Sequence, residues 1–373
     1  MHEQVAATGE DRDNPAGDVR DEDAFDVAAM ASWLRDHAHE GVDTSGLGGT
    51  PDVRQFAGGA SNLTYLLTYP DRELILRRPP SGAKARGAHD MGREHSIQSR
   101  LAPVFGYVPR MVAFCTDESV IGSDFYVMQR LPGTIVRSEL PEGVTLDESG
   151  ARALCERFLD VLAELHDVDV EATGLGDLGK GEGYVARQVG GWSERFRRAR
   201  TDDVGDLETV MGWLDAHQPD DVATCVIHND YRLDNVVLTG AVGGDLRITG
   251  VLDWEMATIG DPLMDLAGAL AYWIQADDEP DFLATRRQPS HLPGMLTRAE
   301  MVAGYAARTG REVTPEQWRF YEVFGLFRLA VIAQQIYYRF HEGQTTNPAY
   351  GAFVDLVRIL DARCSRLVVG GTD

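Results

Sequence analysis

The sequence predicts an α+β protein of two lobes, a small lobe built on an antiparallel β-sheet and a larger helical lobe after it. Runs typical of strands, separated by glycine and proline turns, occupy residues 52–131. Beyond Gly133 the apolar residues recur at helical spacing. We therefore expect the first lobe over 24–132 and the second over 133–373.

The elements follow from these patterns in chain order. A helical period begins at Ala24, and two strands flank the loop that contains Gly58 and Gly59. In the first lobe we expect strands at 53–56, 63–69, 73–78, 112–115 and 125–128 and a helix at 91–101. In the second lobe we expect helices at 151–166, 184–200 and 323–340, and short strands at 225–227 and 248–252 on either side of a hairpin.

Composition narrows the class of protein. The chain has 373 residues and a net charge of −24, and this acidity disfavours a nucleic-acid partner. No apolar run has the length of a membrane span, so we expect no membrane partner. Residues 1–23 are acidic and lack an apolar signal region, which predicts a disordered tail and a cytoplasmic protein. The oligomeric state is left open.

One constellation carries chemistry. Asp230 follows an apolar run, Asn235 lies five positions later, and Asp253 ends a second apolar run. Phosphoryl transfer uses a carboxylate to accept the proton of the attacking hydroxyl, and a carboxylate and an amide to hold Mg²⁺. Asp230 suits the first role, and Asn235 and Asp253 suit the second. Arg232 would neutralise charge on the transferred phosphoryl group. The alternative is a turn whose polar side chains bond only to the backbone.

The segments VIHNDYRLDN and VLDWEMATIGDPLMDLA resemble the catalytic core of aminoglycoside phosphotransferases, which share the protein-kinase-like fold. The resemblance implies ATP and Mg²⁺ as cofactors and a small-molecule hydroxyl as acceptor. Members usually read H-G-D where this chain has Asn229, a position with no chemical role. The resemblance also implies a nucleotide site formed by Gly58, Gly59, Ser61, Asn62, Arg77, Glu94, Met128, Gln129 and Leu131.

Arg77 departs from the kinase pattern, which carries Lys at this place in the third strand. An Arg can grip phosphates and pair with Glu94, but it directs its donors differently. Two readings follow: a working kinase, or a pseudokinase that binds nucleotide and acts as an interaction module. A third reading keeps the fold and transfers AMP instead.

The stretches FAGGASNLTYLLTYPDRELILRRPP, GYVARQVGGWSERF and FRLAVIAQQIYYRF are similar to the kinase-like domain fused to acyl-CoA dehydrogenases in animals. This similarity implies a hydroxyacyl-CoA or a related hydroxylated metabolite as acceptor, with an aminoglycoside-modifying enzyme as the alternative. Acceptor contacts are expected from the helical lobe, at Tyr184, Arg187, Trp192, Arg328, Gln335 and Tyr338. Arg187 and Arg328 suit an anionic acceptor, because a buried Arg needs a partner. Asp261 is expected to cap a helix and to brace the catalytic loop.

Overall fold

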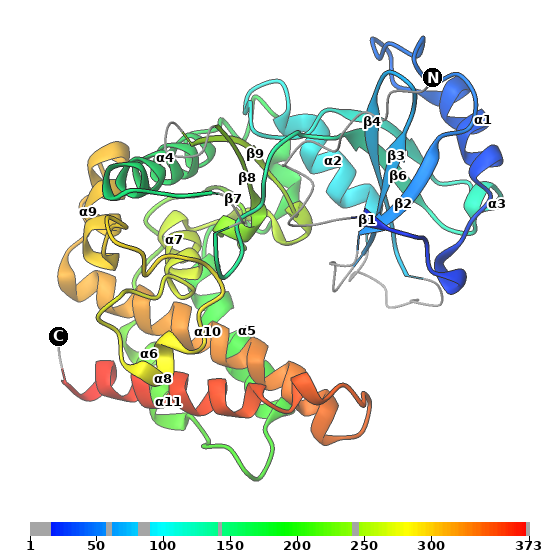
Figure 1. Cartoon of the computed structure of the whole chain (residues 1–373). Helices are drawn as coiled ribbons and strands as arrows, with labels where there is room; N and C mark the ends of the chain where they lie inside the picture. Colours follow the sequence, from blue (N-terminus) through cyan, green and yellow to red (C-terminus); the bar gives the residue numbers. More distant parts are fainter. Residues whose placement is uncertain (1–15, 57–61, 81–89, 141–143, 241–245, 371–373) are drawn as a thin grey trace.

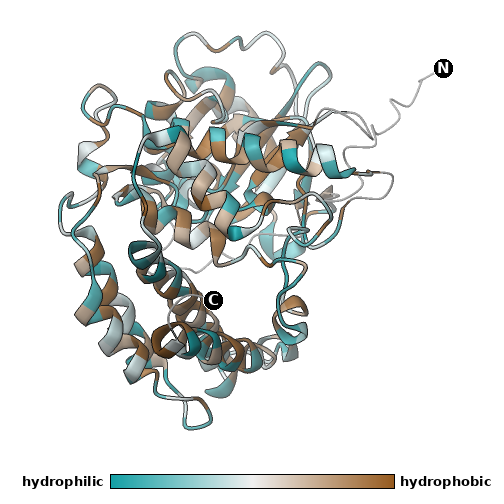
Figure 2. Cartoon of the chain, turned by 90° about the vertical axis from the view of Figure 1, so that its left-hand side faces the viewer, coloured by the Kyte–Doolittle hydropathy of each residue, from teal (hydrophilic) through white to brown (hydrophobic). Residues whose placement is uncertain are grey.

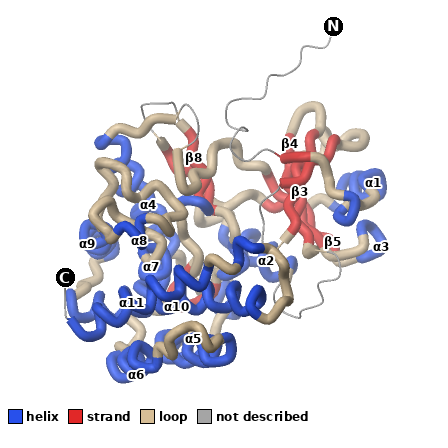
Figure 3. The backbone as a smooth tube through the Cα atoms, turned by 60° about the horizontal axis from the view of Figure 1, so that its bottom comes forward, coloured by secondary structure: helices blue, strands red, loops and turns tan. Residues whose placement is uncertain are grey.

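The computed structural model describes residues 16–56, 62–80, 90–140, 144–240 and 246–370. Within these residues the chain forms a strand-rich lobe followed by a helix-rich lobe (Figure 1). Most of the strands gather on one side of the molecule, and the helices make up most of the other side (Figure 3). The predicted α+β class, with an antiparallel sheet first and helices after it, is confirmed.

Among the described residues, six strands form one antiparallel sheet in the order β1-β2-β3-β4-β6-β5. The predicted strands are confirmed, with ends that shift by one residue at most. The six strands are β1 (Ala16–Gly17), which was not predicted, and the five predicted strands β2 (Asp52–Phe56), β3 (Leu63–Thr68), β4 (Glu73–Arg78), β5 (Met111–Cys115) and β6 (Phe125–Gln129).

Alternation along the strands places a helix layer on each face of this sheet. Tyr65 and Leu67 of β3 pack with α1 (Val27–His37) and α3 (Glu118–Ile121). Leu66, between them, packs with Met91 of α2 (Met91–Leu101). Figure 1 shows α1 and α3 on one side of the sheet and α2 on the other, facing the helical lobe. The position of α2 matters because this helix carries Glu94.

Residues 16–23, which were predicted to belong to a disordered tail, form ordered contacts with the first lobe. β1 pairs with β2, and the 3₁₀ turn η2 (Asp21–Asp23) follows it. Arg78 is buried, and its NH2 group donates to the carbonyl oxygen of Asp23 at 2.6 Å. The side-chain amide of Gln55 donates to the Asp23 carboxylate at 2.8 Å. These contacts order the chain from Ala16, and residues 1–15 lie outside the described part.

The second lobe is built around one long buried helix, α10. Thr314 caps this helix and Pro315 begins it, so it starts eight residues before the predicted Val323. It packs against α5, α6, α7 and α11. Figure 2 shows long apolar stretches in the helices at the centre of this lobe. The helices are α4 (Glu148–His166), α5 (Tyr184–Ala199), α6 (Glu208–His217), α7 (Pro262–Leu270), α8 (Pro280–Leu283), α9 (Arg298–Thr309), α10 (Pro315–His341) and α11 (Phe353–Gly370).

The two predicted short strands of the second lobe do not pair with each other. β7 (Cys225–Ile227) pairs with β10 (Thr258–Gly260), and β9 (Arg247–Val251) pairs with β8 (Val236–Thr239). Two segments therefore connect one strand pair to the other. The segment from β7 to β8 holds Asp230, and the segment from β9 to β10 holds Asp253. In the described part of the chain, no helix combines the length and apolarity that crossing a bilayer requires.

Candidate active site

The segment that joins β7 to β8 holds the predicted base, Asp230. The Asn235 side-chain amide donates to Asp230 Oδ2 at 2.9 Å and to the Asp230 carbonyl oxygen at 2.9 Å. Arg232 Nε lies 3.1 Å from Asp230 Oδ1. The Asp230 side chain is still 24% exposed, so a substrate hydroxyl can reach its carboxylate. The predicted pair Asp230 and Asn235 is thus in direct contact.

Asp265 braces this segment from α7. Its Oδ2 accepts the backbone N–H of His228 at 2.8 Å, and its Oδ1 accepts that of Asn229 at 2.6 Å. His166 Nε2 lies 3.1 Å from Oδ2. Burial opposes the charge of Asp265, but the hydrogen bond and charge of His166, with those of His228, outweigh burial and lower its pKa. A buried anion therefore fixes two consecutive amides immediately before Asp230.

Asp261 caps α7, as predicted, but it does not brace the catalytic loop. Its Oδ1 accepts the N–H groups of Leu263 and Met264, and its Oδ2 accepts that of Val222 at 2.6 Å. Burial raises the pKa of Asp261 to about 6 against the effect of these amides. The bracing role belongs to Asp265, one turn later.

Asn229 has a left-handed backbone, with φ of 68°. Glycine adopts this conformation without strain, and asparagine is among the few other residues that adopt it readily. Asn229 therefore keeps the backbone geometry of the glycine that usually stands at this position. Its side-chain amide also donates to the Tyr184 hydroxyl at 3.0 Å, a contact that glycine cannot make.

The two predicted metal ligands are held together through the backbone. The N–H of Leu252 donates to the Asn235 carbonyl oxygen at 2.8 Å, and Asp253 follows Leu252 with a left-handed φ of 67°. His228 Nε2 contacts the Leu252 carbonyl oxygen at 3.0 Å. An amide and a carboxylate are oxygen ligands of the kind that Mg²⁺ prefers, so this donor set fits Mg²⁺.

Arg77 connects the two lobes. Its NH1 group pairs with Glu94 on α2 and lies 3.4 Å from the Tyr126 hydroxyl. Its NH2 group lies 3.5 Å from Asp253 Oδ1. Burial disfavours the charge of Arg77, but the charge of Glu94, with Tyr126 and Asp253, outweighs burial and raises the pKa of Arg77 well above its ordinary value. Arg77 is therefore a permanent cation beside a predicted metal ligand.

Arg93 makes a second connection between the lobes, and no local sequence pattern indicated it. Its NH1 group donates to the carbonyl oxygen of Glu255 at 3.0 Å, and its NH2 group donates to that of Ala257. Glu255 lies in the 3₁₀ turn η5 (Trp254–Met256), directly after Asp253. The side-chain amide of Asn62, one of the predicted nucleotide residues, lies 3.5 Å from Glu255 Oε2.

Arg232 contacts the segment that follows α7, at Tyr272. Its guanidinium lies 4.5 Å from the centre of the Tyr272 ring and pairs with Asp234 at 3.3 Å. The side chain of Gln288, later in the same loop, accepts the N–H of Leu233 at 2.9 Å. Neither Tyr272 nor Gln288 stood out in the sequence, because each lies in an irregular segment without a motif.

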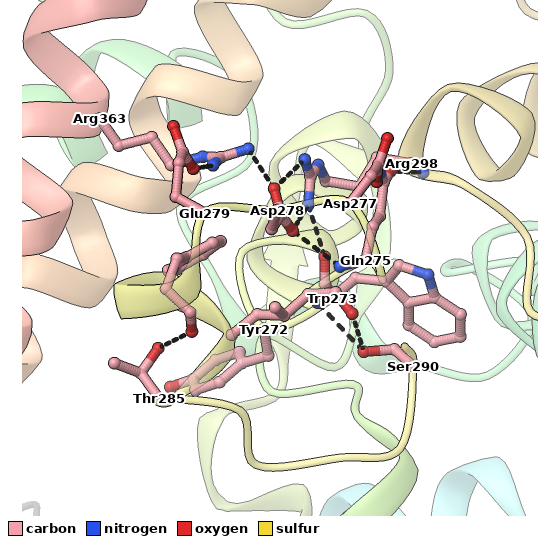
Figure 4. Close-up of polar contacts among 12 residues, drawn as sticks. Tyr272, Trp273, Gln275, Asp277, Asp278, Glu279, Thr285, Ser290, Arg298 and Arg363 are labelled. Atoms are coloured by element: carbon pink, nitrogen blue, oxygen red, sulfur yellow. Dashed lines mark hydrogen bonds and ion pairs between the residues drawn. The ribbon is translucent and has the colours of Figure 1, made fainter. Parts of the chain in front are cut away.

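Ion pairs hold the loop that carries Tyr272 in place. Figure 4 shows Arg298 and Arg363 converging on Asp278, with N–O distances of 2.6 Å and 3.0 Å. Ser290 bonds to the backbone of Ile274 beside Trp273, and so joins the two ends of the loop. Because Asp278 is buried, its ion pairs with Arg298 and Arg363 restrict the movement of the segment that contacts Arg232.

Three predicted acceptor residues lie next to the catalytic loop. Tyr184 is buried and bonds to the Asn229 side chain, and burial raises its pKa to about 12. Arg328 donates to the Asn229 carbonyl oxygen at 2.7 Å. Trp192 lies against Arg328, with the guanidinium carbon 5.4 Å from the ring centre.

The other predicted acceptor residues are placed less closely. Arg187 is exposed, and its guanidinium donates to the carbonyl oxygens of Glu182 and Gly181 in the loop before α5. Gln335 and Tyr338 are half-buried on α10, about two and three helical turns after Arg328.

The predicted nucleotide residues divide into three groups. Gly58, Gly59 and Ser61 lie outside the described residues. Arg77 and Asn62 contact Asp253 and Glu255 of the second lobe, and Glu94 pairs with Arg77. Met128, Gln129 and Leu131 lie at the end of β6 and just after it, but the N–H of Gln129 donates to the Arg110 carbonyl oxygen at 2.8 Å. This N–H is therefore already hydrogen-bonded within the first lobe, and a nucleotide contact at Gln129 stays a prediction.

Comparison with known proteins places this geometry in a family. The sequence profile of the phosphotransferase enzyme family matches residues 52–320. The chain is 35% identical to mouse acyl-CoA dehydrogenase family member 10 over 301 residues, which cover 80% of this chain and 27% of the mouse protein. It is 30% identical to human acyl-CoA dehydrogenase family member 11 over 359 residues, which cover 95% of this chain and 44% of the human protein. The chain thus spans less than half the length of these relatives.

Solved structures agree with this assignment. A Ralstonia eutropha protein assigned provisionally to the aminoglycoside phosphotransferases superposes with a TM-score of 0.77 at 30% identity, covering 94% of this chain and 100% of the other. Aminoglycoside phosphotransferase APH(4)-Ia, in a ternary complex with AMP-PNP and hygromycin B, superposes with a TM-score of 0.53 at 17% identity, covering 87% and 96%, which is a likeness of fold alone. The chain belongs to the phosphotransferase enzyme family, whose members include aminoglycoside phosphotransferases.

Proposed function

We propose that this protein is a small-molecule kinase that transfers the γ-phosphoryl group of ATP to a hydroxyl group, with Asp230 as the catalytic base. One observation carries the proposal. The partly exposed carboxylate of Asp230 is held by Asn235, and Asn235 is tied through Leu252 to Asp253. A base and two oxygen ligands of the type that phosphoryl transfer requires therefore share one connected segment of the fold.

Each residue has a physical task in this mechanism. Asp230 orients the acceptor hydroxyl and accepts its proton as the oxygen attacks phosphorus in line. Arg232, paired with Asp230, holds that carboxylate in position. Asn235 and Asp253 would hold Mg²⁺, which when bound offsets the negative charge of the triphosphate. Arg77 contributes a fixed positive charge on the side of the first lobe.

For the acceptor we propose a hydroxylated metabolite of the hydroxyacyl-CoA type. The support is the similarity to acyl-CoA dehydrogenase family members 10 and 11 over 80% to 95% of this chain. An aminoglycoside is the less suitable acceptor, because aminoglycosides are polycations and Arg328, which has no ion-pair partner among the described residues, contacts the Asn229 carbonyl oxygen directly before Asp230.

A pseudokinase is the second candidate, and one contact favours it. Arg77 NH2 lies 3.5 Å from Asp253 Oδ1, where it competes with a metal ion for the same carboxylate. In this reading the Arg77–Asp253 contact persists when nucleotide binds, and no phosphoryl group is transferred.

The test is Mg²⁺-dependent phosphate transfer from ATP to a panel of hydroxyacyl-CoAs and aminoglycosides, with wild type compared with Asp230→Asn. We expect the variant to lose at least about 100-fold in kcat with ATP affinity preserved. Asp234→Asn is the matched control, since it removes a carboxylate of the same loop that pairs with Arg232, and we expect a loss below about tenfold. ATP binding without transfer by wild type to any acceptor would favour the pseudokinase, and addition of AMP to an acceptor would contradict both readings.

A further inference from the structure

Arg328 is a buried cation that has no counter-charge among the residues the structure describes. Its residue surface is only 6% exposed, yet none of the described carboxylates lies within ion-pair distance of its guanidinium. Its hydrogen bond to the described part of the chain goes to the Asn229 carbonyl oxygen at 2.7 Å. A buried charge is costly unless it is paired or fully hydrogen-bonded. Within the described part of the chain, the environment of Arg328 therefore lacks an anion.

Other arginines of low exposure show what full pairing looks like in this protein. Arg298 makes two hydrogen bonds to the Asp278 carboxylate, and Arg363 pairs with Asp278 as well. Arg78 donates to two backbone carbonyl oxygens and to the Tyr65 hydroxyl. Arg328 has one such partner, although the chain as a whole carries a net charge of −24. Carboxylates are thus plentiful in the protein but are not placed here.

A second unpaired cation lies on the same aromatic ring. The guanidinium carbon of Arg195 is 4.6 Å from the centre of the Trp192 ring, which Arg328 also contacts at 5.4 Å. Arg195 is exposed, and no ion pair joins it to a described carboxylate. Trp192 thus carries two guanidinium groups, one from its own helix and one from α10, and both lack an anionic partner among the described residues.

Of the two cations, Arg328 lies beside the proposed phosphoryl-transfer site. Asn229, whose carbonyl oxygen binds Arg328, directly precedes Asp230. The charge of Arg328 acts on the hydroxyls of both Tyr184 and Tyr272, and Tyr272 also experiences the charge of Asp230. Arg328 therefore contacts both the Asn229 carbonyl oxygen and the Trp192 ring of α5.

We propose that Arg328, with Arg195 on the same indole, forms a subsite for an anionic group of the phosphate acceptor. The inference rests on the proposed kinase function and narrows its substrate class to hydroxylated acids, whose anion is a carboxylate or a phosphate. The guanidinium of Arg328 binds such a group through paired N–H donors, which places the acceptor hydroxyl toward Asp230. A polycationic acceptor is repelled at the same place.

Binding is measured first, so that the test does not depend on turnover. Wild type and Arg328→Gln are titrated by calorimetry, in the presence of Mg²⁺ and ADP, with 3-hydroxybutanoate, its CoA thioester and the neutral 3-hydroxybutanamide. We expect wild type to bind one of the two anionic probes at least about tenfold more tightly than the amide, and Arg328→Gln to lose that preference. If only the CoA thioester binds more tightly than the amide, the anionic group is a phosphate. If the free acid binds more tightly than the amide, the anionic group is a carboxylate.

Two further variants separate the charge from the fold. Arg328→Gln also loses the bond to the catalytic loop, whereas Arg195→Gln does not contact that loop and should weaken anion binding by about threefold. Arg198→Gln removes an exposed arginine of the same helix that is already paired with Glu194, and it should leave the preference intact. Equal binding of acids and amide, binding of no probe, or a preference that survives Arg328→Gln would overturn the proposal.

Turnover of the same probes then separates the subsite from the kinase function. Phosphate transfer without a preference that depends on Arg328 rejects the subsite and leaves the kinase standing. A preference that depends on Arg328, without transfer to any hydroxyl, retains the anion subsite and rejects the kinase.

Discussion

Replacement of Asp265 by asparagine measures how strongly one buried carboxylate holds the catalytic loop. The two oxygens of Asp265 accept the backbone N–H groups of His228 and Asn229 at 2.8 Å and 2.6 Å. An asparagine keeps one accepting oxygen and turns an NH₂ group toward the other N–H. The lost charge-assisted hydrogen bond costs about 1.5–3 kcal/mol, and the unpaired buried N–H costs about 1–3 kcal/mol. We therefore expect the free energy of unfolding to fall by about 3–5 kcal/mol.

The assay is urea unfolding at pH 7, followed by tryptophan fluorescence, with Asp167→Asn as an exposed control in the same lobe. The pKa of Asp265 lies below its ordinary value of 3.8, so the folded chain binds this proton less tightly than the unfolded chain. The stabilisation is present above pH 3.8 and is lost as the pH falls through the lowered pKa. A loss below about 1 kcal/mol at pH 7 would refute the bracing role, because it is less than one charge-assisted hydrogen bond.

Three further predictions follow from other buried groups. Arg77→Met leaves Glu94 without its partner and should lower the free energy of unfolding in urea by about 3–5 kcal/mol. Arg77→Lys keeps a positive charge and should retain most of that free energy. An equal loss in both variants would contradict the ion-pair role. The pKa of Asp261 is raised to about 6, so its contribution to stability falls as the pH rises. Between pH 5 and pH 7 the free energy of unfolding of Asp261→Asn should therefore rise by about 1 kcal/mol relative to that of wild type. A constant difference between the urea midpoints of the two proteins would count against this prediction. Gly294→Ala places a Cβ atom 2.2 Å from the carbonyl oxygen of Glu148, at a residue with a φ of 86°. The substitution should lower the free energy of unfolding by at least about 2 kcal/mol, measured as a lower melting temperature. An unchanged Tm would be the contrary result.

Periodicity in the sequence predicted strands β2 to β6 and helices α2, α4 and α5, but several helices of the second lobe, among them α9 and α11, were not predicted. β4 and α2 begin and end where they were expected, because strand alternation and a helical apolar period are local signals. The predicted cap of α7 by Asp261 is confirmed for the same reason, since a cap and the amides it accepts lie within three residues of each other. The order of the motifs was enough to predict the family.

Tertiary structure decided which side chains meet. Arg328 contacts Asn229 across 99 positions, and Arg93 contacts Glu255 across 162. The loop is braced by Asp265 and not by Asp261, and the N–H of Gln129 is taken by Arg110, because helix orientation and strand register bring those atoms together. Such contacts depend on how α2, α7 and α10 pack against their neighbours, and local sequence spacing carries no record of that packing.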